Sequence, residues 1–169
     1  ISRSNRGLIG LLVDCSGSMD EQIAGGQKSK AEAVSEVGNK LLQNLAIKCS
    51  KGDEIREYFD VSVIGYGRRD IAVGPLFGGT LAGKDIVTIK DIALNPARLD
   101  ERIKKISDGD GGVIDQKIQA PIWFDALHEG GTPMVGAFQY LNGVVKTWVD
   151  SHQSSFPPIL IHVTDGQST

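Results

Sequence analysis

The residues best suited to chemistry lie in the cluster Asp-Cys-Ser-Gly-Ser at positions 14–18, directly after the apolar run 8–13. Such a run predicts a buried parallel strand, and open α/β sheets bind ligands where their strands end. Alternation along an extended chain puts Asp14, Ser16 and Ser18 on one side. One carboxylate and two hydroxyls are hard oxygen donors of the kind that Mg²⁺ prefers. The cluster therefore predicts a magnesium site at the end of this strand.

Two later segments offer oxygens of the same kind, Thr132 in a Gly-Gly-Thr-Pro loop and Asp165 after the apolar run 159–163. In this order the motifs resemble the von Willebrand factor type A domain family with its metal-ion-dependent adhesion site. The family pattern is Asp-x-Ser-x-Ser, then a loop Thr, then an Asp-Gly after a later strand. By this resemblance Ser16, Ser18 and Thr132 would contact the metal directly or through water, while Asp14 and Asp165 would act mostly through water. The competing interpretation is a loop whose Asp and Ser residues only cap the following helix.

Hydrophobic periodicity predicts the elements that must position these residues. We expect strands at 7–13, 58–66, 71–76 and 158–164, and helices at 28–48 and 133–150, the second with Thr132 as its N-cap. The short link between the second and third strands predicts an antiparallel hairpin. The resemblance implies an α/β, doubly wound, mostly parallel sheet of the vWA/Rossmann-like type. Its strand order would be 3-2-1-4, with one antiparallel edge strand.

The chain of 169 residues predicts a single domain, 1–169, with an irregular insertion at 77–129. Within the insertion we expect a short helix at 99–106, a small strand at 113–118, and Trp123 and Phe124 in the core. The family's C-terminal strands and helices are not in this sequence, so the chain is expected to be a truncated domain. The fourth strand would then be an apolar sheet edge that favours self-association.

Composition excludes some partners. The net charge is −3 with interspersed signs, which argues against nucleic acid, and no apolar run reaches the ~18 residues that span a bilayer. The two cysteines, Cys15 and Cys49, are expected to be free thiols, and with the resemblance they favour a bacterial cytoplasmic protein. The chain starts at Ile1 rather than at Met, so an extracellular location stays open.

Taken together, the sequence predicts a Mg²⁺-dependent protein-binding module that is not an enzyme. A carboxylate of a partner protein would complete the metal coordination, and Mn²⁺ or Ca²⁺ could take the place of Mg²⁺. The alternative is a metal-dependent hydrolase or phosphatase-like enzyme. That alternative needs a general base or a second metal, and no residue beyond Asp14 and Asp165 is a candidate. Cys15 has no identifiable His partner, so we predict no catalytic residue.

Overall fold

A computed structural model of the protein describes residues 1–23, 25–107, 109 and 112–166. Its centre is a five-stranded sheet with the order β5-β4-β1-β9, and β6 also pairs with β4. The strands are β1 (Gly7–Asp14), β4 (Phe59–Tyr66), β5 (Val73–Pro75), β6 (Val87–Thr88) and β9 (Ile159–Val163). Strand β1 runs parallel to β4 and β9, whereas β5 and β6 run antiparallel to β4. The protein is therefore a mixed α/β fold with a mainly parallel central sheet, and the predicted order of its four main strands is confirmed.

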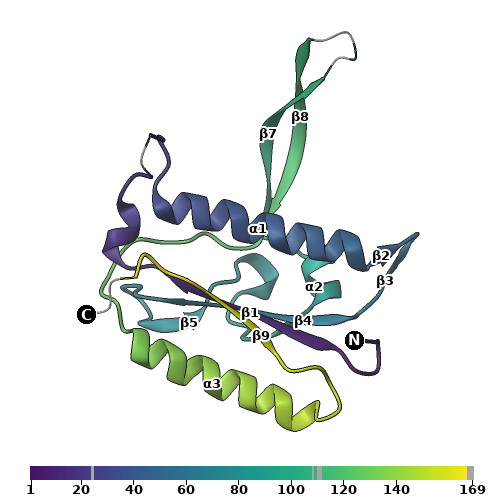
Figure 1. The fold of residues 1–169 in the computed structure, drawn as a ribbon, viewed down its shortest axis with the longest axis vertical. Coiled ribbons are helices and arrows are strands. Elements are labelled where there is room, and N and C mark those ends of the chain that lie inside the picture. Colours follow the sequence, from purple (N-terminus) through teal and green to yellow (C-terminus); the bar gives the residue numbers. More distant parts are fainter. Residues whose placement is uncertain (24, 108, 110–111, 167–169) are drawn as a thin grey trace.

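Helices cover both faces of this sheet (Figure 1). Helices α1 (Lys30–Cys49) and α2 (Ile89–Leu94) lie on one face, and α3 (Met134–Ser151) lies on the other. All eight residues of β1 are buried, because its side chains alternate between the two helical layers. Leu11 and Val13 pack on the α1 side, and Leu12 packs on the α3 side.

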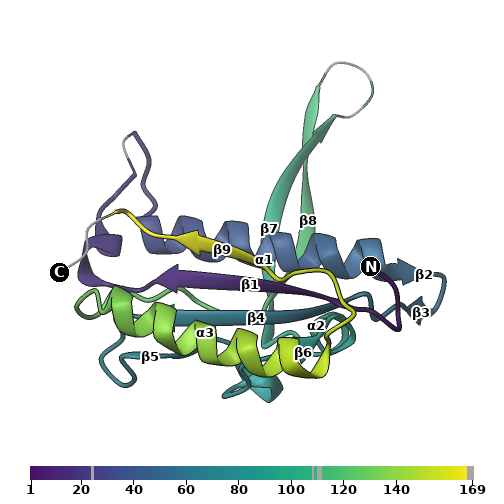
Figure 2. The same ribbon diagram turned by 60° about the horizontal axis from the view of Figure 1, so that its bottom comes forward.

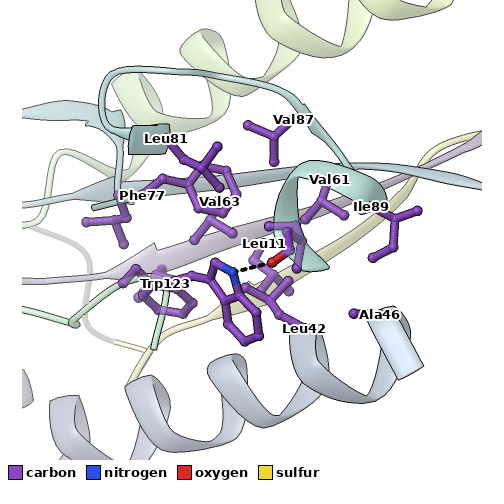
Figure 3. Packing of buried hydrophobic residues seen from close by; sticks show 14 of the residues in the cluster. Leu11, Leu42, Ala46, Val61, Val63, Phe77, Leu81, Val87, Ile89 and Trp123 are labelled. Carbon is purple, nitrogen blue, oxygen red and sulfur yellow. Dashed lines mark hydrogen bonds between the residues drawn. The ribbon is translucent and has the colours of Figure 1, made fainter. Parts of the chain in front are cut away.

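The larger core lies between α1, α2 and the sheet (Figure 3). Leu42 of α1 packs there with Val61 and Val63 of β4. Trp123 and Phe124 are buried in the same cluster, as predicted, and the Trp123 indole N–H donates to the Ile92 carbonyl at 2.7 Å. This core fixes α1 and β1 relative to each other.

The predicted helix at 99–106 is wrong, because this segment is strand β7 (Arg98–Ser107). It pairs antiparallel over its whole length with β8 (Val113–Ile122), which extends the predicted strand at 113–118. Leu99 and Ile103 are four residues apart, a spacing that a helix and one face of a strand share. The ladder with β8 satisfies the backbone and decides in favour of the strand.

Several short elements were not predicted: the 3₁₀ turns η1 (Gly17–Asp20) and η2 (Gly79–Leu81), the small hairpin β2 (Ser50–Lys51) and β3 (Glu54–Ile55), and α2 and β6. Strand β9 ends the order of the central sheet, and its Ile159, Leu160 and Ile161 are exposed. It is thus the expected edge among the described strands, while association through it stays a prediction. No helix in the described part of the chain is long and apolar enough to cross a membrane.

Candidate metal-binding site

The carboxyl ends of β1, β4 and β9 meet at one end of the sheet, on the left in Figure 2. Asp14 is the last residue of β1, and the register places it beside Tyr66, the last residue of β4. Val13 pairs with Val163 of β9, so Thr164 follows at the level of Asp14. Pairing in the sheet thus gathers three chain segments around one carboxylate.

Asp14 is fully buried and is held by three donors. Its Oδ1 accepts the Ser16 backbone N–H at 2.9 Å, and its Oδ2 accepts the Thr164 hydroxyl at 2.8 Å and the Tyr66 phenol at 3.1 Å. A buried carboxylate needs such bonds, because burial without them is costly. All three donors are neutral, so they fix the carboxylate without neutralising its negative charge.

Ser16 and Ser18 bring their hydroxyls together directly beyond this carboxylate. The two Oγ atoms lie 3.1 Å apart and form a hydrogen bond with each other. Adjacent ligands of an octahedral Mg²⁺ ion at its usual bond length lie about 3 Å apart, so this pair of donors fits the ion. The interpretation that these residues only cap α1 is wrong, because Ser29 is the N-cap of α1 and forms a capping box with Glu32.

The loop that carries Thr132 lies against the Ser16 loop. The Gly17 N–H donates to the Gly130 carbonyl at 2.8 Å, and the Glu129 N–H donates to the Cys15 carbonyl at 3.0 Å. These two bonds bring the neighbourhood of Thr132 to the site across more than a hundred residues of sequence.

A glycine makes this approach of the two loops feasible. Gly67, just after β4, has φ +82°, and a Cβ there would clash with the Gly131 carbonyl and crowd the Ser16 backbone. Only glycine adopts this conformation without strain and leaves the necessary space.

Thr132 itself is buried. The prediction that it caps the next helix is wrong, because α3 begins at Met134 with Pro133 at the N-cap position and no side-chain capping bond. The ring of Pro133 fixes its own φ, so the helix can start there without a polar cap. The Thr132 hydroxyl therefore has no capping role that competes with metal binding.

Asp165 follows Thr164 just after the end of β9. In the structure, the ammonium group of Lys30 lies beside its carboxylate. Lys30 Nζ lies 3.2 Å from Asp165 Oδ2 and 2.7 Å from Glu21 Oε2. The hydrogen bond that Lys30 donates to Glu21, with a smaller contribution from Asp165, raises the pKa of Lys30. This contact was not predicted, because Lys30 and Asp165 are 135 positions apart and share no motif.

Tyr66, which donates to Asp14, also contacts His162, and this contact was not predicted. The Tyr66 hydroxyl lies 2.8 Å from His162 Nε2. Because the phenol has one proton and gives it to Asp14, the His162 ring is assigned as the donor in this contact. Burial raises the pKa of Tyr66 and lowers the pKa of His162.

Both cysteines are free and buried. Cys15 packs in the core below α1, and burial raises the pKa of its thiol, which makes it a poor nucleophile. Among the described residues no three His, Cys, Asp or Glu side chains gather in one place. A set of two carboxylates and three hydroxyls is not such a cluster, so this finding does not test the predicted magnesium site.

Comparisons with known proteins do not assign a family. No protein-family model, no curated protein and no solved structure matches this chain. The functional assignment therefore depends on the geometry of the site.

Proposed function

We propose that this protein is a von Willebrand factor type A-like module that binds Mg²⁺ at the end of its sheet and through it binds another protein. Ser16, Ser18 and Thr132 would hold the ion, directly or through water. Asp14 and Asp165 would act mainly through water and orient the hydroxyls. The bound ion would supply an electrophilic position for an acidic side chain of the partner.

One observation carries the proposal: two hydroxyl oxygens lie 3.1 Å apart next to a fully buried carboxylate whose donors are all neutral. Neutral hydroxyls as ligands leave the ion with most of its positive charge. An ion in this state attracts a further anionic oxygen, and the partner's carboxylate would supply it. We place this interaction in the cytoplasm because the structure holds two free, buried thiols. Mn²⁺ and Ca²⁺ are weaker candidates for the same site.

The alternative is a metal-dependent hydrolase. An apolar groove of about 460 Å³ opens beside the site, between α1 and β9, and Lys30 and Asp165 lie among its lining residues. Its walls are mostly aliphatic, and Lys30 is already paired with Asp165, so the groove offers no obvious general base. Hydrolysis of a generic phosphate ester in Mg²⁺ or Mn²⁺ that is lost in Asp165→Ala would favour the enzyme over the binding module.

The proposal predicts that the metal and a carboxylate bind cooperatively. N-acetylglutamate serves as a probe, since it carries the side chain expected of the partner. We expect calorimetry to detect its binding with saturating Mg²⁺ but not with a chelator, and we expect each ligand to strengthen binding of the other by the same factor. Ser16→Ala should abolish the effect, whereas Ser154→Ala, in the loop between α3 and β9, should retain it. Mg²⁺ binding that the probe leaves unchanged would contradict the partner carboxylate.

A further inference from the structure

The β7–β8 hairpin stands out from the body of the protein. It projects away from the sheet and past α1 in both views (Figures 1 and 2). It forms a two-stranded sheet by itself, and no other described strand pairs with it. Isolated two-stranded hairpins are marginally stable in water, and an open edge offers unpaired N–H and C=O groups to another strand. The hairpin is therefore suited to pairing with a further strand.

The sequence of β8 is complementary to itself. In an antiparallel pair of two β8 strands centred on Gln116, Asp115 of each copy lies opposite Lys117 of the other. Likewise, Ile114 of each copy lies opposite Ile118 of the other. Opposite charges and apolar pairs at directly facing positions stabilise antiparallel strands. Residues 113–117 and 119 are all exposed in the single chain, so this stretch of β8 is accessible.

The two faces of the paired hairpins would also match. Within one hairpin Ile106 lies opposite Ile114, so pairing of two β8 strands would place the second copy's Ile118 beside these two residues and form one apolar cluster on each side of Gln116. Ile114 is 51% exposed in the single chain and would be covered by this cluster. On the other face Lys117 already forms an ion pair with Glu101 at 3.0 Å, and the second copy's Asp115 would extend it into a network. Pairing would thus add apolar contacts on one face, which also carries Arg102, and ion pairs on the other, which also carries Ile103.

We propose that the chain forms a symmetric dimer in which the free edges of two β8 strands pair antiparallel around Gln116. The product is a four-stranded antiparallel sheet with the order β7-β8-β8-β7. It involves no residue of the metal site, so it is independent of the proposed function.

Cysteine cross-linking tests the register. In Gln116→Cys the two thiols would face each other across the two-fold axis, with Cα atoms about 5 Å apart, within reach of a disulfide. The matched control is Gln119→Cys, also an exposed glutamine of β8. Its two copies would be six residues out of register, about 20 Å apart. We expect mild oxidation to link Gln116→Cys into a dimer and to leave Gln119→Cys monomeric, since both native cysteines are buried.

Charge exchange tests the pairing itself by sedimentation at increasing concentrations. Lys117→Asp places like charges opposite each other twice and should weaken the dimer about tenfold. The double variant Asp115→Lys, Lys117→Asp also lacks the ion pair with Glu101, yet it should recover dimerisation because the pairs between copies are complementary again. A wild-type chain that stays monomeric at all concentrations would overturn the proposal. Equal cross-linking of the two cysteine variants, or no recovery in the double variant, would overturn the proposed register.

Discussion

Substitution of Asp14 by Ala and by Asn separates the structural role of this carboxylate from its charge. Asp14→Ala leaves the Ser16 amide, the Tyr66 phenol and the Thr164 hydroxyl without their common acceptor. Asp14→Asn keeps an oxygen for the Ser16 amide, and its new NH₂ group can donate to a hydroxyl that turns around to accept. Both variants remove the negative charge.

The expected costs follow from the three hydrogen bonds. A buried donor that loses its acceptor costs about 1–3 kcal/mol, and two of the three donors are hydroxyls that can reorient. We therefore expect Asp14→Ala to lower the free energy of unfolding by about 3–5 kcal/mol, a large share of the stability of a typical domain. Asp14→Asn should cost only about 1–2 kcal/mol. Loss of a charge close to a divalent ion should weaken Mg²⁺ binding by about tenfold or more in both variants.

Urea unfolding with and without Mg²⁺ measures both effects. We expect wild type to be stabilised by the ion, and Asp14→Asn to be folded but not stabilised by the same concentration. Asp14→Ala should be markedly less stable even with a chelator present. A cost below about 1 kcal/mol for Asp14→Ala would refute the hydrogen-bond network. Wild-type Mg²⁺ affinity in Asp14→Asn would refute the role of the charge.

Three further predictions follow from other contacts. Lys30→Gln removes a cation 3.2 Å from Asp165 and should strengthen Mg²⁺ binding several-fold in calorimetry, because the repulsion between the ammonium and the divalent ion is lost. Asn39 donates to the Phe124 carbonyl at 2.8 Å in the core, so Asn39→Ala should lower the free energy of unfolding by about 2–4 kcal/mol in urea. Burial lowers the pKa of His162 below its ordinary 6.5. As the pH falls, His162 therefore becomes protonated in the unfolded chain before it does so in the folded chain. The contribution of the neutral His162 ring to the stability of the fold should be complete above about pH 6.5. It should fall as the pH drops toward the pKa of His162 in the folded state, and thermal melts across that range would show this loss.

Each of these predictions has a matched control. Lys28→Gln removes a lysine that pairs with Glu36 and should leave Mg²⁺ affinity unchanged. Weaker Mg²⁺ binding in Lys30→Gln would show instead that the lysine positions the carboxylate. Asn44→Ala changes an exposed asparagine of α1 and should be nearly neutral, so equal effects at positions 39 and 44 would contradict the core role. His162→Gln should remove part of the acid sensitivity, and an unchanged pH dependence would mean that other groups cause it.

Much of the central sheet could be predicted because its signals are local. The run of apolar residues in β1 is buried on both faces, and such runs are typical of parallel strands. The end of such a strand is where Asp14 was expected to lie, and the structure places it there. The antiparallel link from β4 to β5 follows from the few residues between them.

The remaining features depend on contacts between distant residues. The hairpin of β7 and β8 was missed because residues 99–106 fit a helical spacing, and only the pairing with β8 excludes it. Lys30, Tyr66 and Thr164 carry no motif of their own, and they join the site only because the sheet register and the position of α1 bring them to Asp14 and Asp165. Thr132 was taken as a cap because threonine before proline often is one, yet here Pro133 takes the N-cap position.

Calorimetric titration of Mg²⁺ into the wild-type chain and into Ser16→Ala measures whether the paired hydroxyls bind the ion. The substitution leaves the backbone N–H that Asp14 accepts in place, so the fold should be retained while one of the two paired hydroxyls is lost. We expect saturable binding of one ion to wild type and a loss of that binding in Ser16→Ala. A well-folded wild-type chain that shows no saturable heat change with Mg²⁺, or one whose binding Ser16→Ala leaves unchanged, would contradict Mg²⁺ binding at these hydroxyls.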